Sequence, residues 1–96
     1  MIKGITKGGF EFEIPEEKFN DMRVMDCLRA MNELETDDNA DQVKMIFAVS
    51  ELTEILLGKK GRKKLYDHLQ TDKGQVLIEA VIDEVMDIFN VSNRGN

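Results

Sequence analysis

The sequence predicts a mainly α (α+β) fold, in which an N-terminal β-hairpin precedes about four helices in one small domain. Its 96 residues, 42% of them hydrophobic, suffice for one modest core. Apolar side chains alternate with period two before Pro15 and recur with a helical period after it. We therefore expect residues 1–96 to be a single domain, with a hairpin over 1–14, helices over 16–90 and a frayed tail over 91–96.

The hairpin is predicted by a short alternating segment and a glycine turn. Residues 10–14 read Phe-Glu-Phe-Glu-Ile, so three apolar side chains share one face of a strand. Residues 2–6 predict a weaker partner strand, and Lys7-Gly8-Gly9 allows the positive φ angles of a tight turn. A two-stranded hairpin is marginal alone, so we expect this one to pack against the helices.

Four helical segments follow, separated by breaks in the apolar period. Their expected bounds are 16–34, 40–57, 62–70 and 75–90. Gly58-Lys59-Lys60-Gly61 is the expected connection before the third helix, and Asp72 with Gln75 has the spacing of a capping box before the fourth.

The second of these helices is apolar around most of its circumference. Such a helix is either central or has a second partner surface. Ile46 and Phe47 lie outside its main apolar stripe. We therefore expect self-association through Ile46 and Phe47, giving a homo-oligomer.

Composition and charge exclude several classes of protein. No apolar run approaches the ~20 residues of a membrane span, and the N-terminus lacks an apolar stretch of signal-peptide length. The single cysteine, Cys27, cannot form an internal disulfide, so a cytoplasmic protein is expected. With 13 basic and 19 acidic residues the net charge is −6, which disfavours a global grip on nucleic acid or anionic membrane.

The side chains that could act in catalysis or bind a metal are too few to predict a catalytic or metal site. Asp37, Asn39 and Asp41 begin like a calcium loop, but the required glycine and final glutamate do not follow. Cys27 is interpreted as a core residue, and His68 lies on the polar side of a short helix. We expect no enzyme activity, no metal site and no cofactor.

One basic segment stands out in this acidic chain. It carries five basic residues, Lys59, Lys60, Arg62, Lys63 and Lys64, and includes the G-x-x-G of a KH-type nucleic-acid loop. The KH fold would need a strand after its second helix, where this sequence predicts a loop and another helix. Three interpretations of this segment remain: it is a solvated turn, it contacts a protein partner, or it binds nucleic acid. In the last case the chain would be a small KH-like nucleic-acid-binding regulator, which is the alternative function.

Several segments together resemble a known family. They are Gly9–Ile14, Asp21–Leu28, Leu56-Leu57-Gly58, Lys64–Leu69, Asp72-Lys73-Gly74 and Asp87-Ile88-Phe89. In its apolar positions and turns, the chain resembles tail assembly chaperones of long, non-contractile-tailed bacteriophages (siphophages) and prophages over most of residues 8–90. The basic residues between Lys59 and Lys64 depart from the family pattern.

The resemblance implies a small helical protein of the bacterial host cytoplasm that is not part of the mature virion. Such proteins bind and solubilise the apolar tape-measure protein and help to recruit tail tube subunits. The expected partner-binding surface consists of Leu57, Leu65, Tyr66, Leu69, Ile88 and Phe89.

Overall fold

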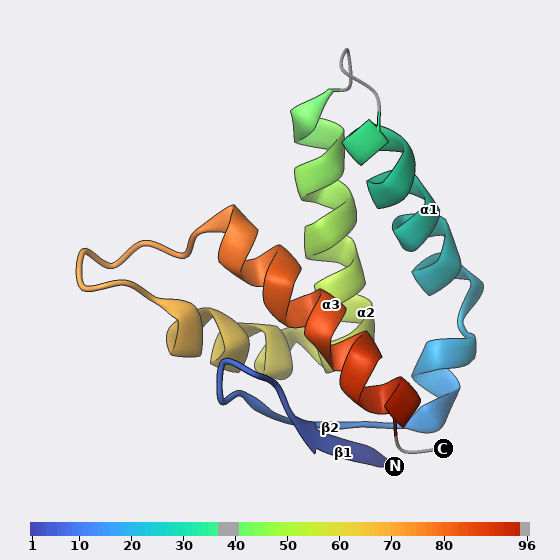
Figure 1. Cartoon of the computed structure of the whole chain (residues 1–96), viewed down its shortest axis with the longest axis horizontal. Helices are drawn as coiled ribbons and strands as arrows, with labels where there is room; N and C mark the ends of the chain where they lie inside the picture. Colours follow the sequence, from blue (N-terminus) through green and yellow to red (C-terminus); the bar gives the residue numbers. More distant parts are fainter. Residues whose placement is uncertain (37–40, 95–96) are drawn as a thin grey trace.

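The computed structural model describes residues 1–36 and 41–94, which form one β-hairpin and three α-helices. The elements are β1 (Ile2–Ile5), β2 (Glu11–Ile14), the 3-10 helix η1 (Glu16–Asn20), α1 (Met22–Thr36), α2 (Gln42–Leu69) and α3 (Ile78–Arg94). The first half of α2 lies beside α1, its second half turns away, and α3 crosses in front of it (Figure 1). The predicted hairpin and mainly helical chain are confirmed, but the described part holds three α-helices rather than four.

The hairpin forms as the alternation predicts. β1 and β2 pair antiparallel with Ile2 opposite Ile14 and Ile5 opposite Glu11. The Thr6 amide donates to the Phe10 carbonyl at 2.9 Å, and Gly9 adopts a φ of 86° to close the turn. Phe12 and Ile14 are buried, because α2 packs against β2 and α3 against β1.

The first helix begins later than the periodicity predicted. Residues 16–20 form η1, and Asp21 then adopts an extended conformation instead of continuing the helix. Its carboxylate accepts the backbone N–H of Arg23 at 2.9 Å, which satisfies one of the free amides at the start of α1. Asp21 is thus the residue that separates the two segments.

The second and third predicted helices are a single element with a bend. Helical structure runs through Gln42–Leu69, and only Gly58 departs from it, with φ 74° and ψ 174°. The predicted break at Gly58 is present, but helical structure resumes directly after it instead of at residue 62, so the two predicted helices are one kinked element. One glycine makes the whole change of direction, so the expected four-residue connection is not needed.

The last helix is displaced toward the C-terminus. Residues 71–75 form a turn in which the Thr71 amide donates to the Gln75 carbonyl at 2.8 Å. The capping box predicted at Asp72 and Gln75 is wrong, because α3 begins only at Ile78. The helix continues to Arg94, past the point where fraying was expected, and the buried Ser92 hydroxyl donates to the Ile88 carbonyl at 2.7 Å.

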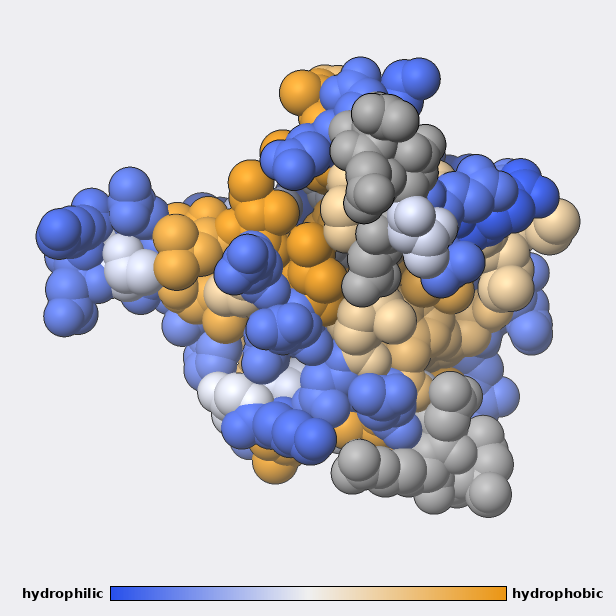
Figure 2. All heavy atoms as spheres, turned by 45° about the horizontal axis from the view of Figure 1, so that its top comes forward, coloured by the Kyte–Doolittle hydropathy of each residue, from blue (hydrophilic) through white to orange (hydrophobic). Residues whose placement is uncertain are grey.

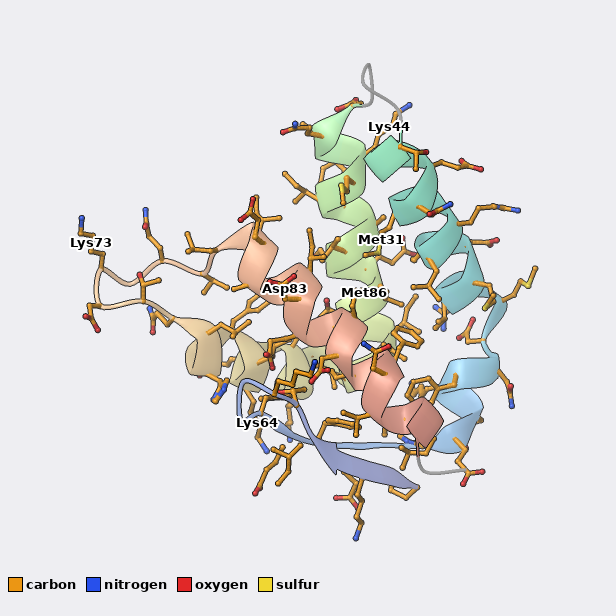
Figure 3. All side chains as sticks on the ribbon, in the orientation of Figure 1. Met31, Lys44, Lys64, Lys73, Asp83 and Met86 are labelled. Carbon is orange, nitrogen blue, oxygen red and sulfur yellow. The ribbon has the colours of Figure 1, made fainter. Side chains whose placement is uncertain are left out.

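The core lies where the hairpin, the bend of α2 and α3 meet. Its fully buried large side chains are Ile14, Val24, Leu52, Leu65, Val85 and Ile88. Met31 lies between α1 and α2 (Figure 3) and is also buried. Thr53 is also buried in this core, and its hydroxyl is satisfied within its own helix, because it donates to the Val49 carbonyl at 2.7 Å.

Candidate partner-binding groove

The predicted partner-binding residues do not form one surface. Leu65 and Ile88 are 0% exposed and belong to the core, so a partner could not contact them without opening the fold. Phe89 packs edge-on against Phe19, with ring centroids 5.6 Å apart. The other three, Leu57, Tyr66 and Leu69, are half-buried against the same core. Apolar residues at helical spacing can face either the core or a partner, and the sequence alone does not distinguish the two.

A shallow groove instead lies between α2 and the start of α3. It measures about 160 Å³ and is lined by Ile46, Val49, Ser50, Tyr66, Val76, Ile78 and Val81. We call it the α2–α3 groove. The bend of α2 creates it, because Ile46 comes from the first half of the helix and Tyr66 from the second. Ile46, predicted for self-association, and Tyr66, predicted for partner binding, therefore lie together.

Exposed apolar side chains extend this groove into a larger surface. Val43 on α2 is 54% exposed, and Leu77 beside α3 is 52% exposed. We call these two residues with the α2–α3 groove the apolar band. Phe47, 67% exposed, lies outside it, in a hollow that α2 forms with Cys27 and Ala30 of α1. Figure 2 shows apolar surface gathered over the first half of α2 and the start of α3. Contiguous apolar surface of this kind is typical of interaction sites.

Sequence reasoning missed part of this band. Leu77 and Ile78 belong to no surface predicted from the sequence, yet they are 52% and 47% exposed. Val43 lies outside the main stripe of its helix, as Ile46 and Phe47 do, and that shared position was a signal that could have identified it. Leu77 and Ile78 could not be found in this way, because their exposure follows from the late start of α3.

The basic segment lies on the second half of α2 and is partly neutralised. Arg62 pairs with Glu54 at 3.4 Å, and Lys63 pairs with Asp67 at 3.0 Å. Lys59, Lys60 and Lys64 are exposed. The sheet has only the two strands β1 and β2 within residues 1–36 and 41–94, so the strand that a KH fold needs after residue 70 is not found there.

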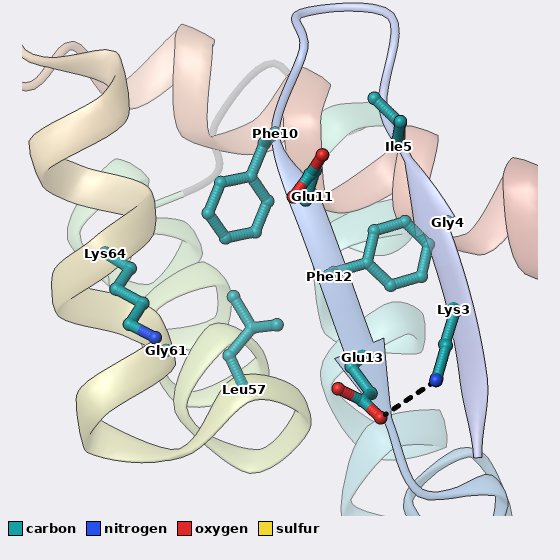
Figure 4. Close-up of a pocket in the computed structure, with 10 residues that line it drawn as sticks. All are labelled: Lys3, Gly4, Ile5, Phe10, Glu11, Phe12, Glu13, Leu57, Gly61 and Lys64. Atoms are coloured by element: carbon teal, nitrogen blue, oxygen red, sulfur yellow. Dashed lines mark ion pairs between the residues drawn. The ribbon is translucent and has the colours of Figure 1, made fainter.

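A wider hollow, of about 690 Å³, lies between the hairpin and the bend of α2 (Figure 4). Its walls carry charges of both signs, with Lys3 and Glu13 paired at 3.6 Å on the hairpin and Lys64 on α2. Leu57 and Gly61 contribute the apolar part of the α2 wall. This hollow is more polar than the α2–α3 groove and offers less to an apolar partner.

The contacts of His68 and Cys27 indicate roles in holding the fold together. The His68 Nε2–H donates to the Gly8 carbonyl at 2.9 Å, and the ring packs on Phe10 with centroids 5.7 Å apart. Cys27 is buried in α1, and burial raises the pKa of its thiol, with Glu51 nearby adding to the effect. His68 thus holds the end of α2 on the hairpin turn, while Cys27 fills the core.

Acidic side chains on α3 contact the same turn from the other side. Glu84 and Asp87 are buried, and they accept hydrogen bonds from the Thr6 hydroxyl and the Lys7 amide. In the described ranges, no three His, Cys, Asp or Glu side chains are placed to hold a metal ion. Of the suspected calcium ligands, Asp37 and Asn39 lie outside these ranges, and Asp41 caps α2 by accepting the Val43 amide.

Comparisons with known proteins found no similar sequence or structure. The chain matches no family model, no curated protein and no solved structure. Among the helices of the described residues, none has the length and apolarity needed to cross a membrane.

Proposed function

We propose that this chain is a tail assembly chaperone of the kind made by long-tailed, non-contractile phages and prophages. It would bind apolar helical segments of the tape-measure protein, keep them soluble and help to recruit tail tube subunits. The proposal places this activity in the cytoplasm of the bacterial host, before the virion is complete. It rests on the resemblance of the apolar pattern and on one structural observation, the apolar band.

The shape of the band favours a helical partner. A groove of about 160 Å³ is smaller than the roughly 300–1,000 Å³ of small-molecule pockets. It suits one or two large side chains projecting from an amphipathic helix, which docks through residues spaced i, i+3, i+4 and i+7. Leu77, which is 52% exposed beside the groove, would cover one flank of such a helix.

The proposal therefore moves the partner surface away from the residues expected from the sequence. Tyr66 and Ile46 stay in it, and Val43, Leu77 and Ile78 join them. Self-association through Ile46 and Phe47 remains part of the proposal. Because Ile46 lines the α2–α3 groove, a second copy bound there would compete with the tape-measure segment.

Co-expression with a tape-measure fragment tests this assignment. We expect the fragment to stay soluble with the wild-type chain and to precipitate when Ile46→Lys or Ile78→Lys replaces it, because a charge in the groove would lose its water on binding. Ile5→Lys is the matched control, since Ile5 is 58% exposed on β1, outside the band. Equal solubility of the fragment with all four chains would reject the proposed surface.

No observation raises the KH-like alternative to a second proposal. The basic segment is helical and two of its five cations are paired with acids. The glycines of its G-x-x-G have another role, which follows from the geometry of α2.

A further inference from the structure

Gly58 occupies a backbone conformation that other residues rarely adopt. Its φ of 74° and ψ of 174° lie in a region populated almost only by glycine. A Cβ atom added to Gly58 would meet no other atom within 4 Å. Glycine is therefore required here by the backbone angles rather than by crowding.

Gly61 is required for a different reason. A Cβ atom added to it would lie 2.7 Å from the Leu57 Cβ, closer than real side chains approach. In a regular helix, Cβ atoms four residues apart are about 5–6 Å from each other. The crowding thus arises from the bend itself, so both glycines are required by a bent α2 and neither by a straight one.

The bend brings the two halves of the chain into one core. Leu65, from the second half of α2, is buried in the same cluster as Leu52 from the first half. Arg62 and Glu54 pair across the bend at 3.4 Å, and His68 reaches the hairpin turn. A straight α2 of 28 residues would be about 42 Å long and would carry Leu65 and α3 away from this core.

We propose that the Gly58–Gly61 segment is a hinge at which residues 59–94 exchange between two copies of this chain. When α2 straightens, the emptied core of each copy would be filled by residues 59–94 of the other. The exchanged dimer would repeat the core contacts, the Arg62–Glu54 pair and the His68–Gly8 hydrogen bond between copies. It would differ from the bent chain only at the hinge, which is the general basis of domain swapping.

The partner is a second copy because only that sequence complements the opened core. The exposed half would present Leu65, Val81, Val85 and Ile88, all nearly fully buried in the bent chain. In the bent chain these side chains already pack in one core with the hairpin and the first half of α2, so they would fit the same surfaces of a second copy. This inference does not depend on the proposed chaperone function, since it concerns how the chain pairs with itself.

Alanine substitutions at the hinge test the exchange. Gly58→Ala and Gly61→Ala each penalise the bent form and favour a continuous helix. After refolding at micromolar concentration, we expect each to raise the dimerisation constant about tenfold or more, measured by light scattering after size-exclusion chromatography. Lys60→Ala on the same helix should leave it unchanged. Gly74→Ala, which strains a positive-φ turn away from the hinge, should lower stability without forming dimers.

A complementation experiment keeps the wild-type glycines and does not depend on the alanine variants folding. Glu54→Arg and Arg62→Glu each place like charges across the bend of a single chain. In an exchanged heterodimer of the two variants, position 54 of each copy meets an opposite charge at position 62 of the other. Co-refolding at millimolar concentration should give heterodimers above the statistical half, counted by native mass spectrometry.

The outcomes are decisive in both directions. Dimers enriched by both hinge alanines, together with excess heterodimer from the charge variants, would establish the exchange. An unchanged dimerisation constant in both alanine variants, or no more than the statistical half of heterodimer from the co-refolded pair, would overturn it.

Discussion

The Thr6 hydroxyl donates a hydrogen bond to the Glu84 carboxylate and joins the hairpin turn to the middle of α3. The same hydroxyl accepts the Phe10 amide at 3.0 Å, so one buried side chain satisfies two polar groups. Gly8 faces the same carboxylate, and an added Cβ would collide with it. The hairpin is thus held between Glu84 of α3 and His68 of α2 in addition to its own short ladder.

Replacing Thr6 by valine should therefore destabilise the chain. The change keeps the side-chain shape but leaves the buried Glu84 oxygen and the Phe10 amide without this partner, and an unsatisfied buried group costs about 1–3 kcal/mol. We expect the free energy of unfolding to fall by about 2 kcal/mol or more in urea titrations. Thr36→Val is the matched control, because that hydroxyl is exposed and its loss should change little. Equal effects at both positions would contradict the anchoring role of Thr6.

Acid should weaken the start of α1 through Asp21. Its hydrogen bonds with Arg23 lower the Asp21 pKa from 3.8 to about 2. Because the folded pKa lies below the unfolded one, this carboxylate stabilises the fold above about pH 4, and the contribution is lost as the pH falls through 2. Asp21→Asn should thus lower the melting temperature at pH 7 and have a smaller effect at pH 2. A change that is the same at both pH values would rule out the charge as the cause.

The thiol of Cys27 should react slowly in the folded protein. Burial raises its pKa and blocks access, so the thiolate that attacks thiol reagents is scarce at neutral pH. Labelling with a disulfide reagent should be slow in buffer and complete within minutes in denaturant. Rapid labelling of a folded sample, checked by circular dichroism, would show that the α1 contact with α2 opens easily.

Nucleic acid should not bind usefully at physiological salt. Three cations of the basic segment remain without an ion pair among the described contacts, and three phosphate contacts in a chain of net charge −6 give weak, salt-sensitive affinity. A filter-binding assay with mixed RNA and DNA at about 150 mM salt should show no retention. Tight binding that the triple variant Lys59→Glu, Lys60→Glu, Lys64→Glu abolishes would revive the KH-like alternative.

The sequence predicted the hairpin and the helical class because both depend on local period. Pro15 marks the switch of period correctly, but a capping side chain and a 3-10 turn delay α1 to Met22. The break of α2 lies at Gly58, as the glycine predicts, but the expected connection is shorter, because helical structure resumes directly after Gly58. Periodicity predicts which residues form the apolar face of a helix, but it does not predict whether that face packs in the core or contacts a partner.

The candidate site was predictable only in part for the same reason. Ile46 and Tyr66 are both expected from the sequence to be interaction residues, yet their common location follows from the bend and from tertiary packing, which place Phe47 on the α1 side instead. Leu65 and Ile88 have the same helical spacing as docking residues but are 0% exposed. Only the three-dimensional arrangement separates these two groups.

The salt dependence of tape-measure binding tests the central claim most directly. Calorimetric titration of a soluble tape-measure peptide into the chain, at about 50 and 500 mM salt, separates apolar from electrostatic binding. If the apolar band is the site, the affinity should change little with salt, the binding heat capacity should be negative, and Ile46→Lys should lose binding while Ile5→Lys retains it. Undetectable binding of a helical tape-measure peptide, or equal affinity for the Ile46→Lys and Ile5→Lys variants, would contradict the account.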